Sequence, residues 1–181
     1  MTFLKTTIAV IVAISFAGYA QAQDSGAYGG LGASAYVTNP DGAFDAELFA
    51  AEAKLGYNFN TYFGVEVQGS LGLNTDSVDL GPETVERKVD YSVAGFAVAR
   101  WPVSDKFQLF ARGGIHNTQV SVDVVNDIGD ITSSINLTET GFAVGAGAQF
   151  NFDKKNAIRA DYTYLDGTNG ETLSLGYIRK F

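Results

Sequence analysis

The chain has 181 residues, with 20 Asp plus Glu against 12 Lys plus Arg, one His and no Cys. A net charge of −8 supplies no basic stripe for phosphates and argues against a nucleic-acid partner. The lack of Cys excludes disulfides, thiolate zinc sites and cysteine nucleophiles. The 21 Gly and 13 Phe favour tightly turning β-structure, and the length allows one domain.

The first 22 residues differ from the rest of the chain. Lys5 is followed by an apolar run from Ile8 to Phe16, and the small residues Ala20 and Ala22 flank Gln21. This arrangement predicts a secretory signal peptide over residues 1–22, cleaved so that the mature chain starts at Gln23. The run is about half the length that a membrane-spanning helix needs. The remaining residues, 23–181, form the predicted domain.

Period-two alternation dominates the mature chain. Phe49, Ala51, Ala53, Leu55 and Tyr57 share one face of a strand, whereas Glu52 and Lys54 lie on the other. Repeating this reading along the chain predicts eight strands, at 27–38, 46–58, 62–74, 89–101, 107–120, 135–150, 157–165 and 171–181.

The connections between these strands fall into two groups. Those around Asn60, at Pro102–Lys106 and at Asn151–Asn156 are short. The alternate links, at 39–45, 75–88, 122–134 and 166–170, include two long loops at 75–88 and 122–134. Uniformly short connections at one end are typical of an up-and-down transmembrane barrel. We therefore predict an all-β, eight-stranded antiparallel transmembrane β-barrel.

Two features favour a membrane barrel over a soluble barrel with an apolar interior. Aromatic residues gather near the short turns, as an interfacial girdle should. The face opposite the apolar one carries Gly and Ala beside isolated charges, which suits a narrow lumen. The predicted lumen charges are Glu52, Lys54, Glu66, Arg112, Arg159 and Asp161. Because an unpaired buried charge is costly, we expect these six to pair across strands.

Four stretches carry a family resemblance: GYNFNTYFGVEVQGSLGL (56–73), ARWPVSDKFQLFARGGI (99–115), TGFAVGAGAQFNF (140–152) and TLSLGYIRKF (172–181). They resemble the small outer-membrane β-barrel family that includes the OmpA transmembrane domain, OmpX and opacity-type proteins. The resemblance covers 27–181 and implies the outer membrane of a Gram-negative cell, with its lipid bilayer and lipopolysaccharide as surroundings.

The resemblance also implies an assembly signal in the last strand, read by the outer-membrane barrel assembly machinery. The family pattern is polar-x-Gly-x-x-aromatic-x-aromatic, matched here by Ser174, Gly176 and Phe181. Arg179 stands where the pattern has an aromatic residue, and Tyr177 lies two residues earlier on the same face.

Three patterns could carry chemistry, and we assign none of them a catalytic, cofactor or metal role. The single His, His116, is followed at plus two by Thr118, and we read it as a polar residue near the barrel mouth. Gly30-Leu31-Gly32-Ala33-Ser34-Ala35 matches a dinucleotide motif in letters but lacks the following helix. The acidic cluster Asp123, Asn126, Asp127 and Asp130 lacks the order of a calcium loop.

The sequence thus predicts a non-enzymatic outer-membrane barrel with a structural or surface-interaction role and a lumen plugged by side chains, since eight strands leave little more room. A small porin-like channel for ions or small solutes and a soluble exported ligand-binding barrel are the alternatives. Any surface ligand is expected at the acidic segments 75–88 and 122–134.

Overall fold

The computed structural model describes residues 25–38, 46–79, 83–126, 131–167 and 170–181. The predicted signal peptide and the link at 39–45 lie outside these residues. The strands in the described part are β1 (Gly26–Thr38), β2 (Ala46–Asn58), β3 (Phe63–Gly72), β4 (Thr75–Asp79), β5 (Glu83–Pro102), β6 (Phe107–Asn126), β7 (Ile131–Asn151), β8 (Asn156–Leu165) and β9 (Gly170–Lys180). No described helix has the length and apolarity needed to cross a membrane.

The strands close into a barrel through two pairings that join distant parts of the chain. β1 pairs with β9, and β3 pairs with β5, so every strand except β4 has a neighbour on both sides in the described chain. All pairings are antiparallel. The barrel therefore has eight strands, with β4 as an extra segment paired to β5. Closure leaves no free edges in the barrel wall, and the predicted fold is confirmed.

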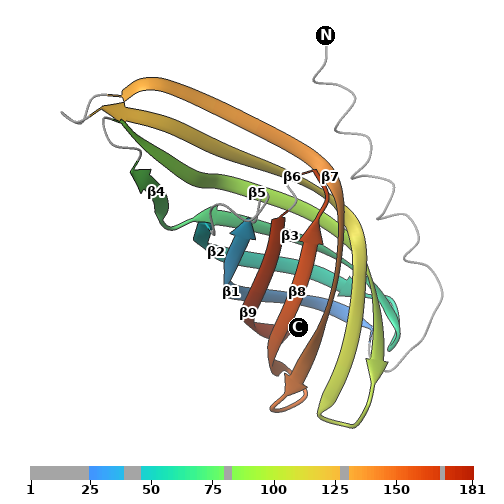
Figure 1. Cartoon of the computed structure of the whole chain (residues 1–181). Helices are drawn as coiled ribbons and strands as arrows, with labels where there is room; N and C mark the ends of the chain where they lie inside the picture. Colours follow the sequence, from blue (N-terminus) through green and yellow to red (C-terminus); the bar gives the residue numbers. More distant parts are fainter. Residues whose placement is uncertain (1–24, 39–45, 80–82, 127–130, 168–169) are drawn as a thin grey trace.

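The two predicted long loops are wrong. Most of 75–88 forms an antiparallel pair between β4 and β5, and 122–134 lies largely in β6 and β7. Together with β4, the long strands β5, β6 and β7 run past the shorter strands as a sheet that projects beyond the barrel (Figure 1). We call the part of this sheet formed by 75–79, 83–90, 117–126 and 131–140 the extension.

The polarity of the alternation explains why the sequence predicts loops in these segments. In the barrel wall, apolar residues point outward and polar ones inward. In the extension, Val120 and Val122 lie on the face that continues the lumen, whereas Ser121 and Asp123 lie on the outer face. The period of the alternation remains two, but the outer face becomes polar and the inner face apolar. This exchange is expected where the outer face of a sheet contacts water instead of lipid.

A bulge in β5 marks this exchange. Val89 pairs with Val120 and Tyr91 pairs with Gln119, which leaves Asp90 as an extra residue. Its carboxylate accepts a hydrogen bond from the Ser121 hydroxyl at 2.6 Å. From Tyr91 to Trp101 the outward residues of β5 are apolar, a span of about 25 Å along the axis of a barrel whose strands tilt by about 40°. That span matches the apolar band of a membrane barrel.

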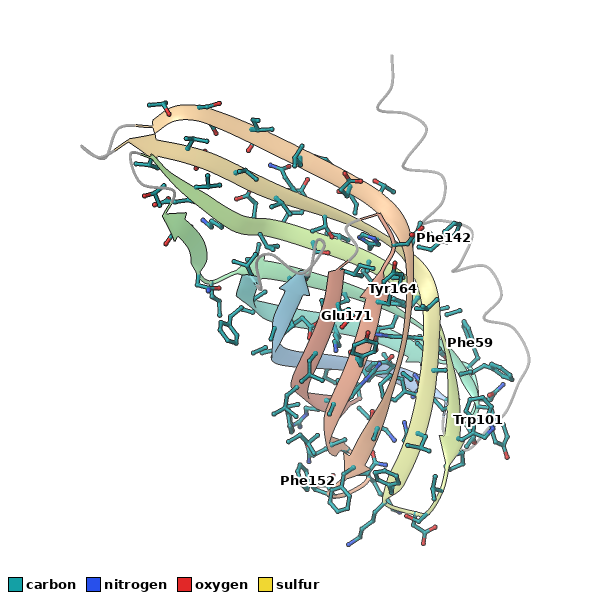
Figure 2. The ribbon with its side chains drawn as sticks, viewed as in Figure 1. Phe59, Trp101, Phe142, Phe152, Tyr164 and Glu171 are labelled. Atoms are coloured by element: carbon teal, nitrogen blue, oxygen red, sulfur yellow. The ribbon has the colours of Figure 1, made fainter. Side chains whose placement is uncertain are left out.

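Aromatic side chains line the turns between β2 and β3, β5 and β6, and β7 and β8, which we call the short-turn end. Phe59, Trp101 and Phe152 all lie at this end (Figure 2). Trp101 is 58% exposed and Phe152 is 54% exposed, so neither is part of a protein core. At the other end of the wall, Phe142 and Tyr164 also face outward (Figure 2). Aromatic rings at both ends of an apolar band are typical of the two membrane interfaces.

Candidate functional site

The lumen is filled in its middle by charged side chains from β2, β3, β6 and β8. All six predicted lumen charges are there, and each is at most 5% exposed. They are Glu52, Lys54, Glu66, Arg112, Arg159 and Asp161. They point inward because successive side chains of a strand alternate between its two faces, and each of the six lies on the face opposite the apolar residues of the wall.

Glu66 is the carboxylate nearest the short-turn end of this cluster. It accepts a hydrogen bond from Arg159 Nη1 at 2.6 Å and from Arg112 Nη1 at 3.1 Å. The Tyr28 hydroxyl donates to its Oε2 at 2.7 Å. Glu66 therefore joins two guanidinium groups from strands that lie across the lumen.

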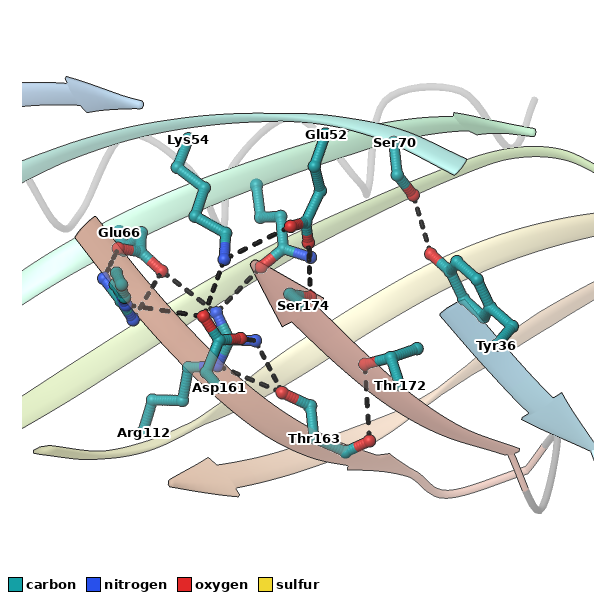
Figure 3. Close-up of polar contacts among 12 residues, drawn as sticks. Tyr36, Glu52, Lys54, Glu66, Ser70, Arg112, Asp161, Thr163, Thr172 and Ser174 are labelled. Atoms are coloured by element: carbon teal, nitrogen blue, oxygen red, sulfur yellow. Dashed lines mark hydrogen bonds and ion pairs between the residues drawn. The ribbon is translucent and has the colours of Figure 1, made fainter. Parts of the chain in front are cut away.

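Asp161 is the second shared carboxylate. Lys54 Nζ donates to Oδ2 at 2.8 Å, Arg112 Nη2 donates to Oδ1, and Arg159 Nε lies 3.5 Å from Oδ2. All three cations thus contact one carboxylate. Figure 3 shows Lys54, Arg112 and Asp161 converging from different strands.

Glu52 completes the cluster on the side of the extension. Its carboxylate lies 3.3 Å from Lys54 Nζ and accepts hydrogen bonds from the Ser174 hydroxyl at 3.2 Å and from the Gln68 amide. Gln68 in turn accepts from Arg112 Nη1 at 2.8 Å. Neutral side chains therefore complete the hydrogen bonding of the charged ones.

The six charges balance, with three acids against three bases. Arg112 also lies 4.4 Å from the centre of the Phe96 ring, and Arg159 lies 3.8 Å from that of Phe110. Gly145 makes room for this packing, since a Cβ there would sit 3.2 Å from Arg112 Nε. A neutral, densely bonded network of this kind fills space without carrying net charge, and loss of one member leaves a partner unpaired.

An apolar layer covers the network toward the extension. Its buried members include Tyr36, Leu48, Val89, Ala143 and Leu165, with Val120 packed against them. The Tyr36 hydroxyl is hydrogen-bonded to Ser70 at 2.7 Å, so the layer has few free polar groups (Figure 3). The lumen therefore changes from charged to apolar along its axis.

His116 lies in the lumen wall and is 2% exposed. Its Nε2 is 2.8 Å from the carbonyl oxygen of Asp166, and its Nδ1 is 3.1 Å from Thr118 Oγ1. Thr118 is also hydrogen-bonded to Ser92 at 2.8 Å. A carbonyl only accepts, so Nε2 carries the proton of the bond to Asp166. His116 thereby ties β6 to the end of β8.

The other two sequence patterns lie in strands. The Gly30–Ala35 stretch is inside β1, which is not the turn that a dinucleotide motif requires. Asp123 lies in β6, whereas Asp127 and Asp130 are outside the described residues. Among the residues that the structure describes, no three His, Asp or Glu side chains form a group that could hold a metal ion.

The residues of the implied assembly signal lie on both faces of β9. Ser174 is buried against Glu52, whereas Tyr177 faces outward and its hydroxyl donates to Asn156. Phe181 is 78% exposed, and its backbone N–H donates to Ala27 at 3.0 Å. Gly176 faces β1, where an added Cβ would meet the Leu31 carbonyl oxygen at 3.0 Å.

Several lumen residues are not among the candidates that the sequence singles out. Tyr28, Gln68 and Thr163 complete the bonding of the charges, and Arg100 lies buried near the short-turn end. The alternation of side chains along the strand could have identified Arg100, because it lies on the same face of β5 as the buried residues Phe96 and Val98.

Comparison with known proteins agrees with this architecture. The family described as "Outer membrane protein beta-barrel domain" matches residues 6–181. Comparison with curated protein sequences returned no match.

Among solved structures, this chain is similar to Ail of Yersinia pestis, which was crystallised in complex with the heparin analogue sucrose octasulfate. The two sequences are 21% identical and the TM-score is 0.62. The match covers 87% of this chain and 99% of Ail. Neisserial surface protein A (NspA) is 20% identical, with a TM-score of 0.61 and coverage of 87% and 98%. The N-terminal barrel domain of Pseudomonas aeruginosa OprF is 13% identical, with a TM-score of 0.57 and coverage of 87% and 99%. At these identities the likeness concerns the fold.

Proposed function

Because this chain belongs to the outer membrane protein β-barrel domain family, we propose that it is a plugged barrel that presents its extension as an interaction surface. Members of this kind lie in the outer membrane of Gram-negative cells, and so does this chain. A soluble exported barrel is therefore set aside. The extension carries the proposal, since four strands held together beyond the apolar band serve no purpose in crossing a membrane.

The topology of such barrels supports an outward-facing extension. Short turns normally lie on the periplasmic side and long connections outside the cell. The short-turn end also holds the start of β1 and the end of β9. The extension, at the opposite end, then lies outside the cell and is accessible to partners.

Acidic side chains dominate the extension. Glu86, Asp90, Asp123 and Glu139 belong to its described side chains, against Lys88. Ail binds a polyanionic heparin analogue, but an acidic surface repels such a ligand. We therefore propose a basic partner at the extension, or divalent cations that bridge it to lipopolysaccharide.

A binding experiment on intact cells tests this surface. Fluorescent polylysine should bind cells that display the protein, and Glu86→Gln with Asp123→Asn should weaken binding by at least threefold. Asp105→Asn with Asp153→Asn removes the same charge at the short-turn end and should change nothing. Tighter binding of heparin than of polylysine, or equal loss in both double variants, would refute a basic partner.

The charged network and the apolar layer support the plugged lumen. A porin-like path would need both to open, and each ion pair of the network is desolvated. Purified protein in planar bilayers should show no conductance steps above those of protein-free bilayers. Reproducible single-channel steps would instead favour the alternative, a small channel. The proposed role is non-catalytic, and both ring nitrogens of His116 are engaged in structural contacts.

A further inference from the structure

A second feature lies at the short-turn end of the lumen, away from the extension. A cavity of about 430 Å³ opens there. Its lining includes Tyr28, Asn58, Arg100, Gln108, Gln149 and Lys180. This volume falls within the range of small-molecule pockets, and most of the lining residues are polar, which suits a polar ligand.

Arg100 distinguishes this cavity from the rest of the lumen. The residue is 6% exposed, yet in the described part of the chain no carboxylate lies within 4.0 Å of its guanidinium. Nη2 contacts the Tyr28 hydroxyl at 3.3 Å, and Nη1 is buried without a hydrogen-bond acceptor. A buried cation with one weak neutral partner is costly to the protein unless an anion compensates it.

No carboxylate of the charged network is free to provide that compensation. Glu66 is the network carboxylate nearest to the short-turn end. It already accepts hydrogen bonds from Arg112, Arg159 and Tyr28. The three acids of the network are matched by its own three bases. Arg100 is thus a surplus positive charge at the wall of the cavity.

The surroundings hold Arg100 in place. Its guanidinium lies 5.5 Å from the centre of the Tyr28 ring. It also lies against Gly64, where a Cβ would sit 2.9 Å from Nη1. Positioned by a ring and by the absence of a side chain, the guanidinium is pre-organised for a ligand.

The other lining groups define what the ligand must offer. Lys180 adds a second cation, and Asn58 and Gln149 are buried amides, with Asn58 Oδ1 lacking a donor. Ile178 contributes an apolar wall, whereas Asp105, the carboxylate of the lining, lies on an exposed turn. We propose that this cavity binds a small organic anion whose carboxylate or phosphate group pairs with Arg100.

Side-chain nitrogen NMR of the full mature protein in detergent micelles tests the site. Inorganic phosphate and acetate are titrated separately, with chloride at equal ionic strength as the reference. A saturable shift of Arg100 Nε with phosphate, acetate or both is expected, and the two arms show which oxyanion is preferred. A linear drift equal to that in chloride would mean screening alone and would overturn the proposal.

Matched variants locate the binding. Arg100→Gln should lower the apparent affinity at least tenfold, as judged from the amide shifts of Asn58 and Asn60, whereas Lys106→Gln, at the same end but outside the lining, should titrate like the wild type. Equal losses in both variants would overturn the site. If Arg100→Gln does not fold, Lys180→Gln replaces it. A crystal structure grown in the oxyanion that saturates the shift, but with only water at Arg100, would also refute it.

Discussion

At the scale of single residues, Arg112 is the centre of the lumen. It bonds to Glu66 and Gln68 of β3 and to Asp161 and Thr163 of β8. These two strands lie on opposite sides of β6 in the barrel. A guanidinium suits this position because its fixed fork of donors can serve several acceptors at once. A lysine would offer three donors on one point charge in place of the five donors of the planar guanidinium.

We expect Arg112→Ala to destabilise the barrel by about 3–5 kcal/mol, since it removes one of the two guanidinium groups that Glu66 and Asp161 share and leaves three buried acids against two bases. Denaturant unfolding from lipid vesicles, followed by the fluorescence of the single Trp, Trp101, measures this. A double-mutant cycle with Glu66→Ala should show strong coupling, and one with Glu52→Ala, which has no ion pair with Arg112, should show much less.

Lys154→Ala, on an exposed turn, is the control and should change stability by less than about 0.5 kcal/mol. Independent behaviour of Arg112 and Glu66 would contradict a paired network.

At the scale of secondary-structure elements, β6 performs two tasks in one strand. From Phe107 to Ile115 its outward residues belong to the apolar band, and from Asn117 onward they carry the polar outer face of the extension. Asn117 donates to Thr140 at 2.7 Å, and the Ser121 hydroxyl lies 2.7 Å from the Asn136 side chain across this outer face. The extension is therefore a hydrogen-bonded sheet in its own right.

A proline scan along β6 separates the two tasks. Ser121→Pro removes a backbone donor and strains the ladder in the extension, but it should leave the barrel folded, with unchanged heat-modifiable migration on a detergent gel. Gly113→Pro, on the same face within the apolar band, should abolish that migration because water cannot replace the lost bond there. Loss of the folded band in both variants would show that the barrel depends on the extension.

The turn between β7 and β8 contains a titrating group outside the membrane. Asp153 accepts from the Asn156 side chain at 2.8 Å and from the backbone N–H groups of Lys155 and Asn156. These bonds hold the pKa of the Asp153 carboxyl below its ordinary value.

A lowered folded-state pKa adds stability above the unfolded pKa, and this stability is lost as pH falls through the folded value. We therefore expect the protection of the Lys155 and Asn156 amides, taken relative to the intrinsic exchange rate at each pH, to fall in acid, below about pH 4. Asp153→Ala should lower this protection at neutral pH and remove its dependence on acid. A wild-type exchange profile in the variant would contradict this.

At the scale of the whole molecule, the barrel joins its two ends where β1 meets β9. Phe181 lies at this seam, next to Gly29, and is more exposed than any other large hydrophobic residue in the described chain. We propose that it serves the outer-membrane assembly machinery, in line with the family pattern.

Phe181→Ala should lower the yield of folded protein in the outer membrane of cells and should leave refolding of purified protein into detergent nearly unchanged. Phe152→Ala, another exposed aromatic at the same end, is the matched control for loss of an interfacial anchor. Equal yields for Phe181→Ala and wild type in cells would contradict the proposal.

Export itself remains a prediction from residues 1–22. Cleavage after Ala22 would produce a mature chain that begins at Gln23. N-terminal sequencing of protein recovered from outer-membrane fractions should read Gln23 first. Recovery of Met1 in membrane-bound protein would contradict cleavage.

The sequence alone determined the strand faces and the short turns, and therefore the barrel. The inward placement of Glu52, Arg112 and Asp161 follows from parity, because successive side chains of a strand must alternate. The same local rule marks the aromatic ends of the wall, where Trp101 and Phe152 adjoin short turns.

Only the tertiary structure decided which charges pair, because Arg112 and Asp161 are brought together by barrel closure and strand register. It also decided that 75–88 and 122–134 are largely strands, since alternation cannot tell whether the side facing away from the lumen meets lipid or water. The unpaired state of Arg100 is likewise a property of the closed lumen, where the carboxylate nearest to it is already held by two other guanidinium groups.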